Sequence, residues 1–278
     1  MASTTFQNFE GKHITVHILN NHFYYQAVML LEHFDIPEFS DCVINVGDYV
    51  HPKAISNLRL AYPNKKIVIY QLEQLVSQNH WWPTDKLIKR VAEADEVWDY
   101  DPLNAIVLQK NGIKVNRIIP MLYTRDLDKI QSKEDPHIDV LFYGTGNERR
   151  FKILQDIQYK NFMGLNIVWS AGPLDNDEFI SNSKVILNLH AYDLENRQEQ
   201  TRIFYPVING KTVVSETSTL NNMRGCVIEI DIHQLSVYMK YIVQNNIWKY
   251  YGLSAKEKLK AATEEYMHNF HNSLKAES

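Results

Sequence analysis

A glycine-rich stretch with two arginines, residues 144–150 (GTGNERR), carries the clearest chemical signal in the sequence. It follows an apolar run with strand character and opens a stretch with helical character. Glycines let a backbone approach a ligand, and a helix N-terminus offers free amides to an anion. We therefore expect a diphosphate to contact Gly144, Thr145, Asn147, Arg149 and Arg150. An ordinary strand-to-helix turn with two surface arginines is the alternative.

This stretch lacks two features of better-known phosphate-binding loops. It has no third glycine of the dinucleotide fingerprint, and it has no lysine of the loop found in nucleotide hydrolases. NAD binding and ATP hydrolysis are therefore disfavoured.

Residues in three later stretches are candidates for the same site. His190 ends an apolar strand (184–190), and the carboxyl ends of parallel strands face the ligand crevice in α/β sheets. Glu195, Glu199 and Arg202 are spaced by four and three residues and share one helix face, where Glu199 and Arg202 would also form an ordinary ion pair. Small and acidic side chains follow the next strand, where exposed amides at a strand end can bind an anion: Ser215 and Glu216.

The catalytic base has two candidates in loops after the first strands, His22 and Asp48, each of which has loop capping as its alternative role. The pair Asp99 and Asp101 has the spacing of a metal-binding motif. Asp101 is followed by Pro102, however, which favours a helix N-cap with proline at the first helical position. We expect no metal requirement and no cofactor.

Short apolar runs alternate with helical patterns along the whole chain, which favours an α/β fold with parallel sheets. Strands are expected at 13–19, 42–46, 66–70, 96–100, 115–119, 138–143, 165–169, 184–190, 212–215 and 226–230. A polar stretch at 121–137 interrupts the rhythm. We predict two Rossmann-like domains with a donor/acceptor cleft between them: an acceptor domain at 1–125, a nucleotide-sugar-binding domain at 138–245 and C-terminal bracing helices at 246–278.

Composition narrows the class of protein. The 278 residues carry a net charge of −4, so no global basic field favours nucleic acid. Cys42 and Cys226 sit in separate apolar runs, which is typical of buried free thiols. The first residues, MASTTFQNFEGKH, contain no apolar leader pattern, so we expect no secretory signal, and no apolar run reaches membrane-spanning length. We expect a cytoplasmic protein, of a bacterium or an infected host cell, that is a monomer or a homodimer.

Three stretches together resemble the donor-binding domain of GT-B glycosyltransferases, in particular short bacterial, phage and large-virus members: FYGTGNERRFKIL, KVILNLHAYDLENRQEQTRI and NGKTVVSET. The resemblance covers roughly residues 138–231. It implies that Gly144, Arg149 and Arg150 meet the donor diphosphate and that the ordered set of His190, Glu199, Arg202, Ser215 and Glu216 completes the site. Tyr205 stands where many retaining members carry a second Glu, so the stereochemical outcome stays open.

The resemblance implies transfer of a sugar from a nucleotide diphosphate sugar, with a UDP-sugar favoured, to a hydroxyl acceptor. A surface glycan and hydroxymethylated phage DNA are both candidate acceptors, the latter requiring extrusion of the base. Two other functions fit the same architecture: a sugar-nucleotide epimerase and a non-catalytic nucleotide-sugar-binding module.

Overall fold

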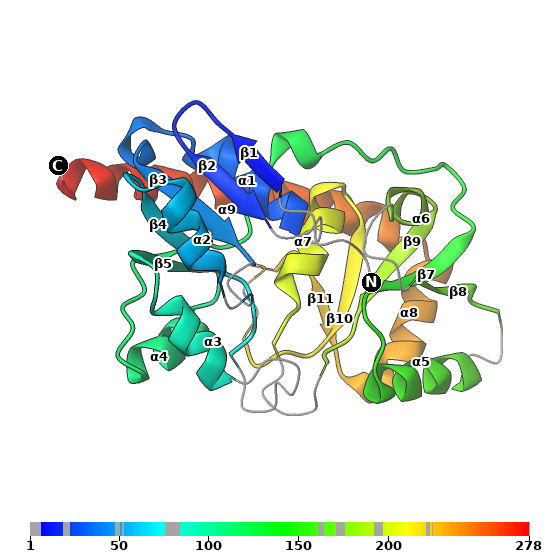
Figure 1. Cartoon of the computed structure of the whole chain (residues 1–278). Helices are drawn as coiled ribbons and strands as arrows, with labels where there is room; N and C mark the ends of the chain where they lie inside the picture. Colours follow the sequence, from blue (N-terminus) through cyan, green and yellow to red (C-terminus); the bar gives the residue numbers. More distant parts are fainter. Residues whose placement is uncertain are drawn as a thin grey trace. The chain divides into compact units, whose positions relative to one another are not determined.

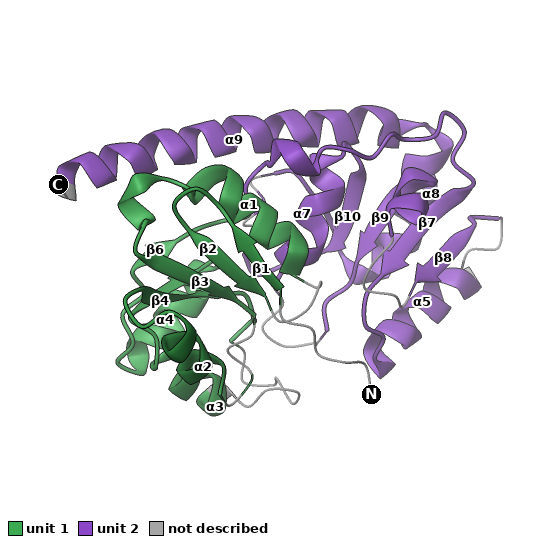
Figure 2. Cartoon of the chain, turned by 45° about the horizontal axis from the view of Figure 1, so that its top comes forward, with its two compact units in different colours: residues 1–121 green, residues 122–278 purple. Residues whose placement is uncertain are grey.

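A computed structural model describes residues 7–18, 23–47, 51, 53–75, 84–160, 164–170, 176–191, 197–220, 223 and 225–277 (Figure 1). The chain divides into two compact units, residues 1–121 and 122–278 (Figure 2). Each unit contains one sheet. Neighbouring strands in both sheets are parallel, apart from one antiparallel pair at an edge of the first sheet. The predicted α/β class with two Rossmann-like sheets is confirmed.

The sheet of the first unit has six strands in the order β1-β2-β3-β4-β5-β6. Its strands are β1 (Gln7–Glu10), β2 (Thr15–Ile18), β3 (Cys42–Val46), β4 (Lys66–Gln71), β5 (Glu96–Asp99) and β6 (Arg117–Ile118). Its helices are α1 (Tyr24–Phe34), α2 (Ala54–Ala61), α3 (Thr84–Val91) and α4 (Pro102–Lys110). Strand order follows chain order, so the described strands of this unit have no point at which the order reverses.

Strand β1 is the part of this sheet that the sequence pattern did not predict. It is four residues long, pairs with β2 in antiparallel fashion, and alternates between half-buried and exposed side chains. Strands β2 and β3 are buried along their whole length, as expected for parallel strands covered on both faces. An edge strand therefore leaves a much weaker hydrophobic signal than the strands that it protects.

Local sequence rules account for helix α4. The Asp101 carboxylate accepts a hydrogen bond from the Leu103 amide at 2.8 Å, and Pro102 occupies the first helical position. The helix ends at Asn111, and Gly112 follows with φ of +78°. Asp99 is fully buried and accepts hydrogen bonds from Gln71 and Asn104. The preferred assignment of Asp101 as a helix cap is confirmed.

The second unit contains a five-stranded parallel sheet in the order β11-β10-β9-β7-β8. Its strands are β7 (Ile138–Tyr143), β8 (Ile167–Ser170), β9 (Ser183–Asn188), β10 (Thr212–Glu216) and β11 (Ile228–Ile230). Its helices are α5 (Glu148–Lys160), α6 (Asp177–Ser181), α7 (Gln200–Ile208), α8 (Leu235–Gln244) and α9 (Ile247–Glu277). Residues 122–137 of the polar stretch and the last helix both belong to this unit. Helix α9 covers nearly all of the stretch 246–278, for which C-terminal helices were predicted.

Strand order reverses in this second sheet. Strand β7 pairs with β8 on one side and with β9 on the other (Figure 2). The chain therefore passes from β7 to β8 on one side and then crosses to β9 on the other side of β7. In open α/β sheets, ligands bind beyond the carboxyl ends of the two strands at such a reversal. The topology of the second unit therefore singles out the segments that follow β7 and β9.

The core of this unit explains why those strands are buried on both faces. Alternate residues of β7 and β9, such as Phe142 and Leu187, pack in one cluster with Ile157 of α5 and Met239 of α8. Helices α7 and α9 contact β10 and each other. Period-two alternation in the strands and the apolar stripes of the helices together produce this layered packing.

One charged side chain is buried at the start of β10. The Lys211 side chain is 2% exposed, and its amino group donates hydrogen bonds to the carbonyls of Ser181 and Ser183 at 3.0 and 3.1 Å. Burial lowers the pKa of Lys211 from 10.5 to about 8. The amino group thus closes the turn between α6 and β9 at a cost in desolvation.

We predict that replacing this lysine changes how stability depends on pH. Below pH 8 the ammonium is charged in both states, so the folded protein bears the full desolvation cost. Between pH 8 and 10.5 the folded state sheds its proton first, and the free energy of unfolding rises by about 3 kcal/mol from this group. Lys211→Met should lack that rise in denaturant titrations across this range, whereas Lys240→Met on α8 should retain it. An identical rise in the Lys211 variant would contradict the assignment.

Candidate functional site

The predicted site begins where β7 ends. Gly144 has φ of +133°, a conformation that L side chains rarely adopt. A Cβ atom at this position would lie 2.9 Å from Nε of Arg202, so glycine is also required for space. The turn therefore brings bare backbone against a guanidinium group.

Asn147 fixes the start of α5 after this turn. Its side-chain oxygen accepts a hydrogen bond from the Arg150 amide at 2.9 Å, which is the geometry of an N-cap. Its side-chain amide donates to the carbonyl of Ala191 at 2.7 Å. The N-cap thus ties the segment after β7 to the segment after β9, the two segments that the sheet topology singles out.

Arg150 is the most deeply enclosed of the predicted arginines, at 4% exposure. Its guanidinium donates to the carbonyls of Thr145 and Leu189 at 2.7 and 3.1 Å, and to the Glu199 carboxylate at 2.9 Å. Burial, together with the positive charge of the neighbouring Arg202, lowers the pKa of Arg150 to about 10. The group stays positively charged at neutral pH.

Arg149 forms a two-pronged ion pair with Glu216 at the end of β10. The paired nitrogen–oxygen distances are 2.9 and 2.6 Å, and one nitrogen also donates to the carbonyl of His190 at 3.0 Å. The Glu216 carboxylate accepts a further hydrogen bond from the His190 amide. Both side chains are largely buried. Arg149 therefore joins α5 to the ends of β9 and β10, and Glu216 is its counter-charge.

Arg202 contrasts with the other two arginines. Its guanidinium lies 3.6 Å from the Glu199 carboxylate and 3.5 Å from the side-chain oxygen of Asn188, both at the limit of useful contact. It also lies over the Phe142 ring, 5.8 Å from the centroid, and Arg150 lies over the same ring at 5.7 Å. Most hydrogen-bond donors of Arg202 thus have no close acceptor among the described residues.

The remaining predicted residues have more internal roles. Ser215 is fully buried, accepts a hydrogen bond from Asn188 and donates to the Glu216 carbonyl. His190 is 2% exposed, with Nε2 at 3.3 Å from both the Thr217 carbonyl and the Ser218 hydroxyl. Thr145 contributes its carbonyl to Arg150. His22, Asp48 and Glu195 lie outside the described residues.

Two residues of the site were not predicted from the sequence. Phe142 supplies the ring beneath two guanidinium groups, and Asn188 links Arg202 to Ser215. A polar residue inside the apolar run 184–190 was an available signal for Asn188. Phe142 had no such signal, because an aromatic residue in a buried strand is ordinary core.

The electrostatics favour a bound anion. Among the described residues, the ion pairs of this cluster join three guanidinium groups to two carboxylates, which leaves one positive charge in excess. The described part of the chain contains no group of three or more His, Cys, Asp or Glu side chains placed to hold a metal ion. The excess guanidinium charge can donate hydrogen bonds to an oxygen of a bound phosphate.

Comparison with known proteins bears on the fold of the chain. No protein-family model matches the sequence, and no curated protein matches it. Solved structures do match. TarM superposes with a TM-score of 0.54 at 12% identity, over 92% of this chain and 58% of TarM. The chain has the GT-B glycosyltransferase fold.

Two matched GT-B structures contain a nucleotide. One is a TarM variant of S. aureus in complex with Fondaparinux, alpha-GlcNAc-glycerol and UDP, with a TM-score of 0.56 at 12% identity over 92% of this chain and 59% of that one. The other is HepE of Anabaena in complex with UDP and glucose, with a TM-score of 0.56 at 8% identity over 85% and 78% of the two chains. This GT-B chain therefore spans less than two thirds of the TarM chains.

The buried ion pair yields a stability prediction. Glu216→Gln should leave the Arg149 guanidinium without its counter-charge, which typically costs on the order of 3 kcal/mol or more of unfolding free energy. The matched control is Glu148→Gln, which removes one partner of the exposed Glu148–Lys152 pair and should leave the denaturation midpoint unchanged. Equal midpoints for the two variants in urea titrations would show that the Arg149–Glu216 pair has no structural role.

Proposed function

We propose that this chain is a glycosyltransferase that binds a nucleotide diphosphate sugar at the carboxyl ends of β7 and β9. The main support for this proposal is the environment of the Arg202 guanidinium. This group lies against the Gly144 turn and has few close partners, in a cluster with excess positive charge. A UDP-sugar is the favoured donor, since two structures with the same fold contain UDP.

In this proposal the donor diphosphate lies beside Gly144, which has no side chain of its own and packs against the Arg202 guanidinium. Arg202 supplies hydrogen bonds to its oxygens, and the N-terminal end of α5 adds the positive end of a helix dipole. As the bond to the sugar breaks, negative charge builds up on the leaving diphosphate. Preorganised positive charge at that position stabilises the transition state more than the ground state.

The sequence predicts that Arg149 and Arg150 contact the donor diphosphate, whereas we propose that both support the site from within the protein. Each is held by a carboxylate and by backbone carbonyls, so their role is to build the turn and to set the local potential. The proposal includes no metal ion, and transfer should therefore persist in the presence of a chelator. His22 and Asp48 stay candidates for the base that deprotonates the acceptor hydroxyl.

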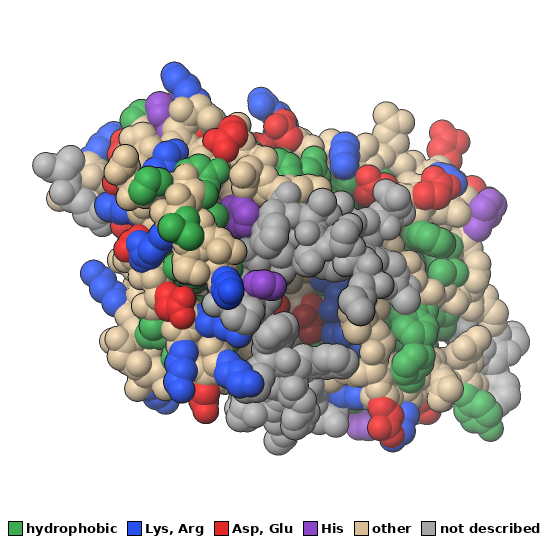
Figure 3. All heavy atoms as spheres, viewed as in Figure 1, with side chains coloured by type: hydrophobic (Ala, Val, Ile, Leu, Met, Phe, Trp, Pro, Cys, Tyr) green, Lys and Arg blue, Asp and Glu red, His purple; other side chains and the backbone are tan. Residues whose placement is uncertain are grey.

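The acceptor is proposed to carry a hydroxyl group, either on a surface glycan or on a hydroxymethylated base of phage DNA. The first 125 residues contain 12 Lys and Arg against 13 Asp and Glu. Side chains of both signs are interspersed over the described surface on the face shown in Figure 3. This balance favours the glycan. Acceptor binding that weakens steeply with added salt would favour DNA instead.

The proposal predicts a specific loss of donor affinity. Arg202→Ala should weaken UDP binding by at least about tenfold, the usual effect of removing a charged hydrogen-bond donor to phosphate. The matched control is Arg125→Ala, because the Arg125 side chain is 83% exposed in the same unit. Isothermal titration of UDP, GDP, CDP, ADP and TDP into both variants and the parent would also identify the base. Unchanged UDP affinity in the Arg202 variant would refute the phosphate contact.

Turnover separates transfer from the two other functions of this architecture. A glycosyltransferase should consume the donor and release the nucleoside diphosphate when acceptor is present, beyond slow hydrolysis. An epimerase would convert the donor sugar without an acceptor. A binding module would bind the donor and leave it unchanged.

A further inference from the structure

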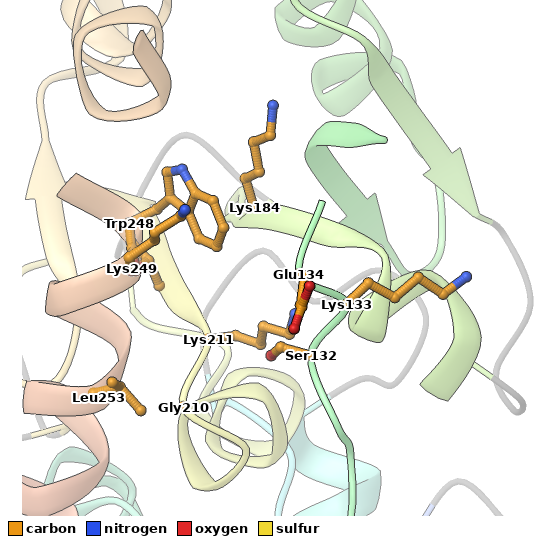
Figure 4. A pocket seen from close by; sticks show the side chains of 10 residues that line it. Ser132, Lys133, Glu134, Lys184, Gly210, Lys211, Trp248, Lys249 and Leu253 are labelled. Carbon is orange, nitrogen blue, oxygen red and sulfur yellow. The ribbon is translucent and has the colours of Figure 1, made fainter. Parts of the chain in front are cut away.

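A pocket lies at the end of the same sheet opposite the predicted donor site, where β9 and β10 begin. It has a volume of about 360 Å³ and lies entirely within the second unit (Figure 4). Segment 132–134, the start of β9, the turn before β10 and the first turns of α9 contribute its walls. None of these residues belongs to the predicted donor site. The size suits a small ligand.

Four lysines and one glutamate line this pocket: Lys133, Lys184, Lys211, Lys249 and Glu134. Lys184 pairs with Asp139 at 2.7 Å, and Lys133 pairs with Glu178 at 2.5 Å. Lys249 lies over the ring of Trp248, 5.3 Å from the centroid, instead of beside a carboxylate. With these partners counted, the pocket retains one positive charge in excess.

Lys211 is the buried member of this set. Both acceptors of its amino group are backbone carbonyls, and no carboxylate lies within 4 Å of it among the described residues. The Ser181 carbonyl that accepts from Lys211 also accepts from the Lys133 amide at 3.1 Å, so the ammonium lies next to the segment that forms one pocket wall. Figure 4 shows the side chain pointing toward the residues Ser132 and Glu134 of that segment.

A buried ammonium without a counter-charge is costly in a folded protein, and an anion held nearby would offset that cost. The neighbouring walls add an apolar component, because Trp248 and Leu253 line the pocket between the lysines. Lysines bind phosphate as compact point charges. The pocket therefore combines positive charge at its edges with an apolar wall.

We propose that this pocket binds a small phosphorylated molecule, whose phosphate faces Lys211 and Lys249 and whose carbon skeleton packs on Trp248. The site is separate from the predicted donor site and does not depend on the proposed transfer reaction. Occupation would brace the start of β9 and β10 against the first turns of α9, and the ligand would thereby stabilise the second unit.

Calorimetric titration at constant ionic strength tests this site. The probes are inorganic phosphate, glucose 6-phosphate and citrate, and the protein is the full chain with Arg202→Ala, so that binding at the predicted donor site is weakened. We expect saturable binding of glucose 6-phosphate, tighter than that of inorganic phosphate. Adding Lys249→Ala should weaken it at least about tenfold. Adding Lys240→Ala, which removes the same charge from α8 outside the pocket, should leave the affinity unchanged.

Lys211→Met in the same background is the second variant and should also abolish binding. If this variant does not fold, the Lys249 and Lys240 pair still decides the question. Equal affinity in those two variants would overturn the proposal, because it would show nonspecific attraction. Absence of glucose 6-phosphate binding, or binding of citrate alone, would overturn it as well.

Discussion

The guanidinium group of Arg150 is the constraint on which the site depends. It has been removed from water, and three acceptors from separate segments satisfy it: the turn after β7, the end of β9 and the start of α7. A buried cation that lost any of these partners would bear a large desolvation cost. The three segments therefore hold one another in register through this one side chain, and the Gly144 turn is fixed as a consequence.

The three arginines of the cluster differ in how they are held. Arg149 and Arg150 are each paired with a carboxylate, and these two ion pairs connect α5 to the end of β10 and to the start of α7. Arg202 is held mainly by stacking on Phe142 and lies beside bare backbone at Gly144. Its weak polar contacts within the protein suit a group that bonds to a ligand. Positive charge thus concentrates where the strand order reverses.

Local rules allowed part of this structure to be predicted from the sequence. The glycine turn, the Asn147 cap and the Asp101 cap follow from residue types at short spacing, and the parallel sheets follow from alternating apolar runs. The pairing of Arg149 with Glu216 joins positions 67 residues apart. No short-range pattern specifies which of several arginines meets that carboxylate. The assignment of ligand contacts therefore needed the fold.

Strand β1 and Lys211 show two further ways in which sequence patterns fall short. An edge strand of four residues with half-exposed side chains has little hydrophobic signal. A lysine next to a turn is expected to be solvated, and only the packed structure shows it buried, with its amino group on the same Ser181 carbonyl as the Lys133 amide. Positions 22 and 48, proposed as acceptor-side bases, lie outside the described residues and stay predictions.

The most direct test of the central claim is a crystal structure of the chain in complex with UDP. We expect the diphosphate to lie beyond the carboxyl ends of β7 and β9, with at least one phosphate oxygen within hydrogen-bonding distance of the Arg202 guanidinium and close to the Gly144 backbone. Density for the diphosphate at the lysine pocket, or elsewhere away from Arg202, would contradict the account.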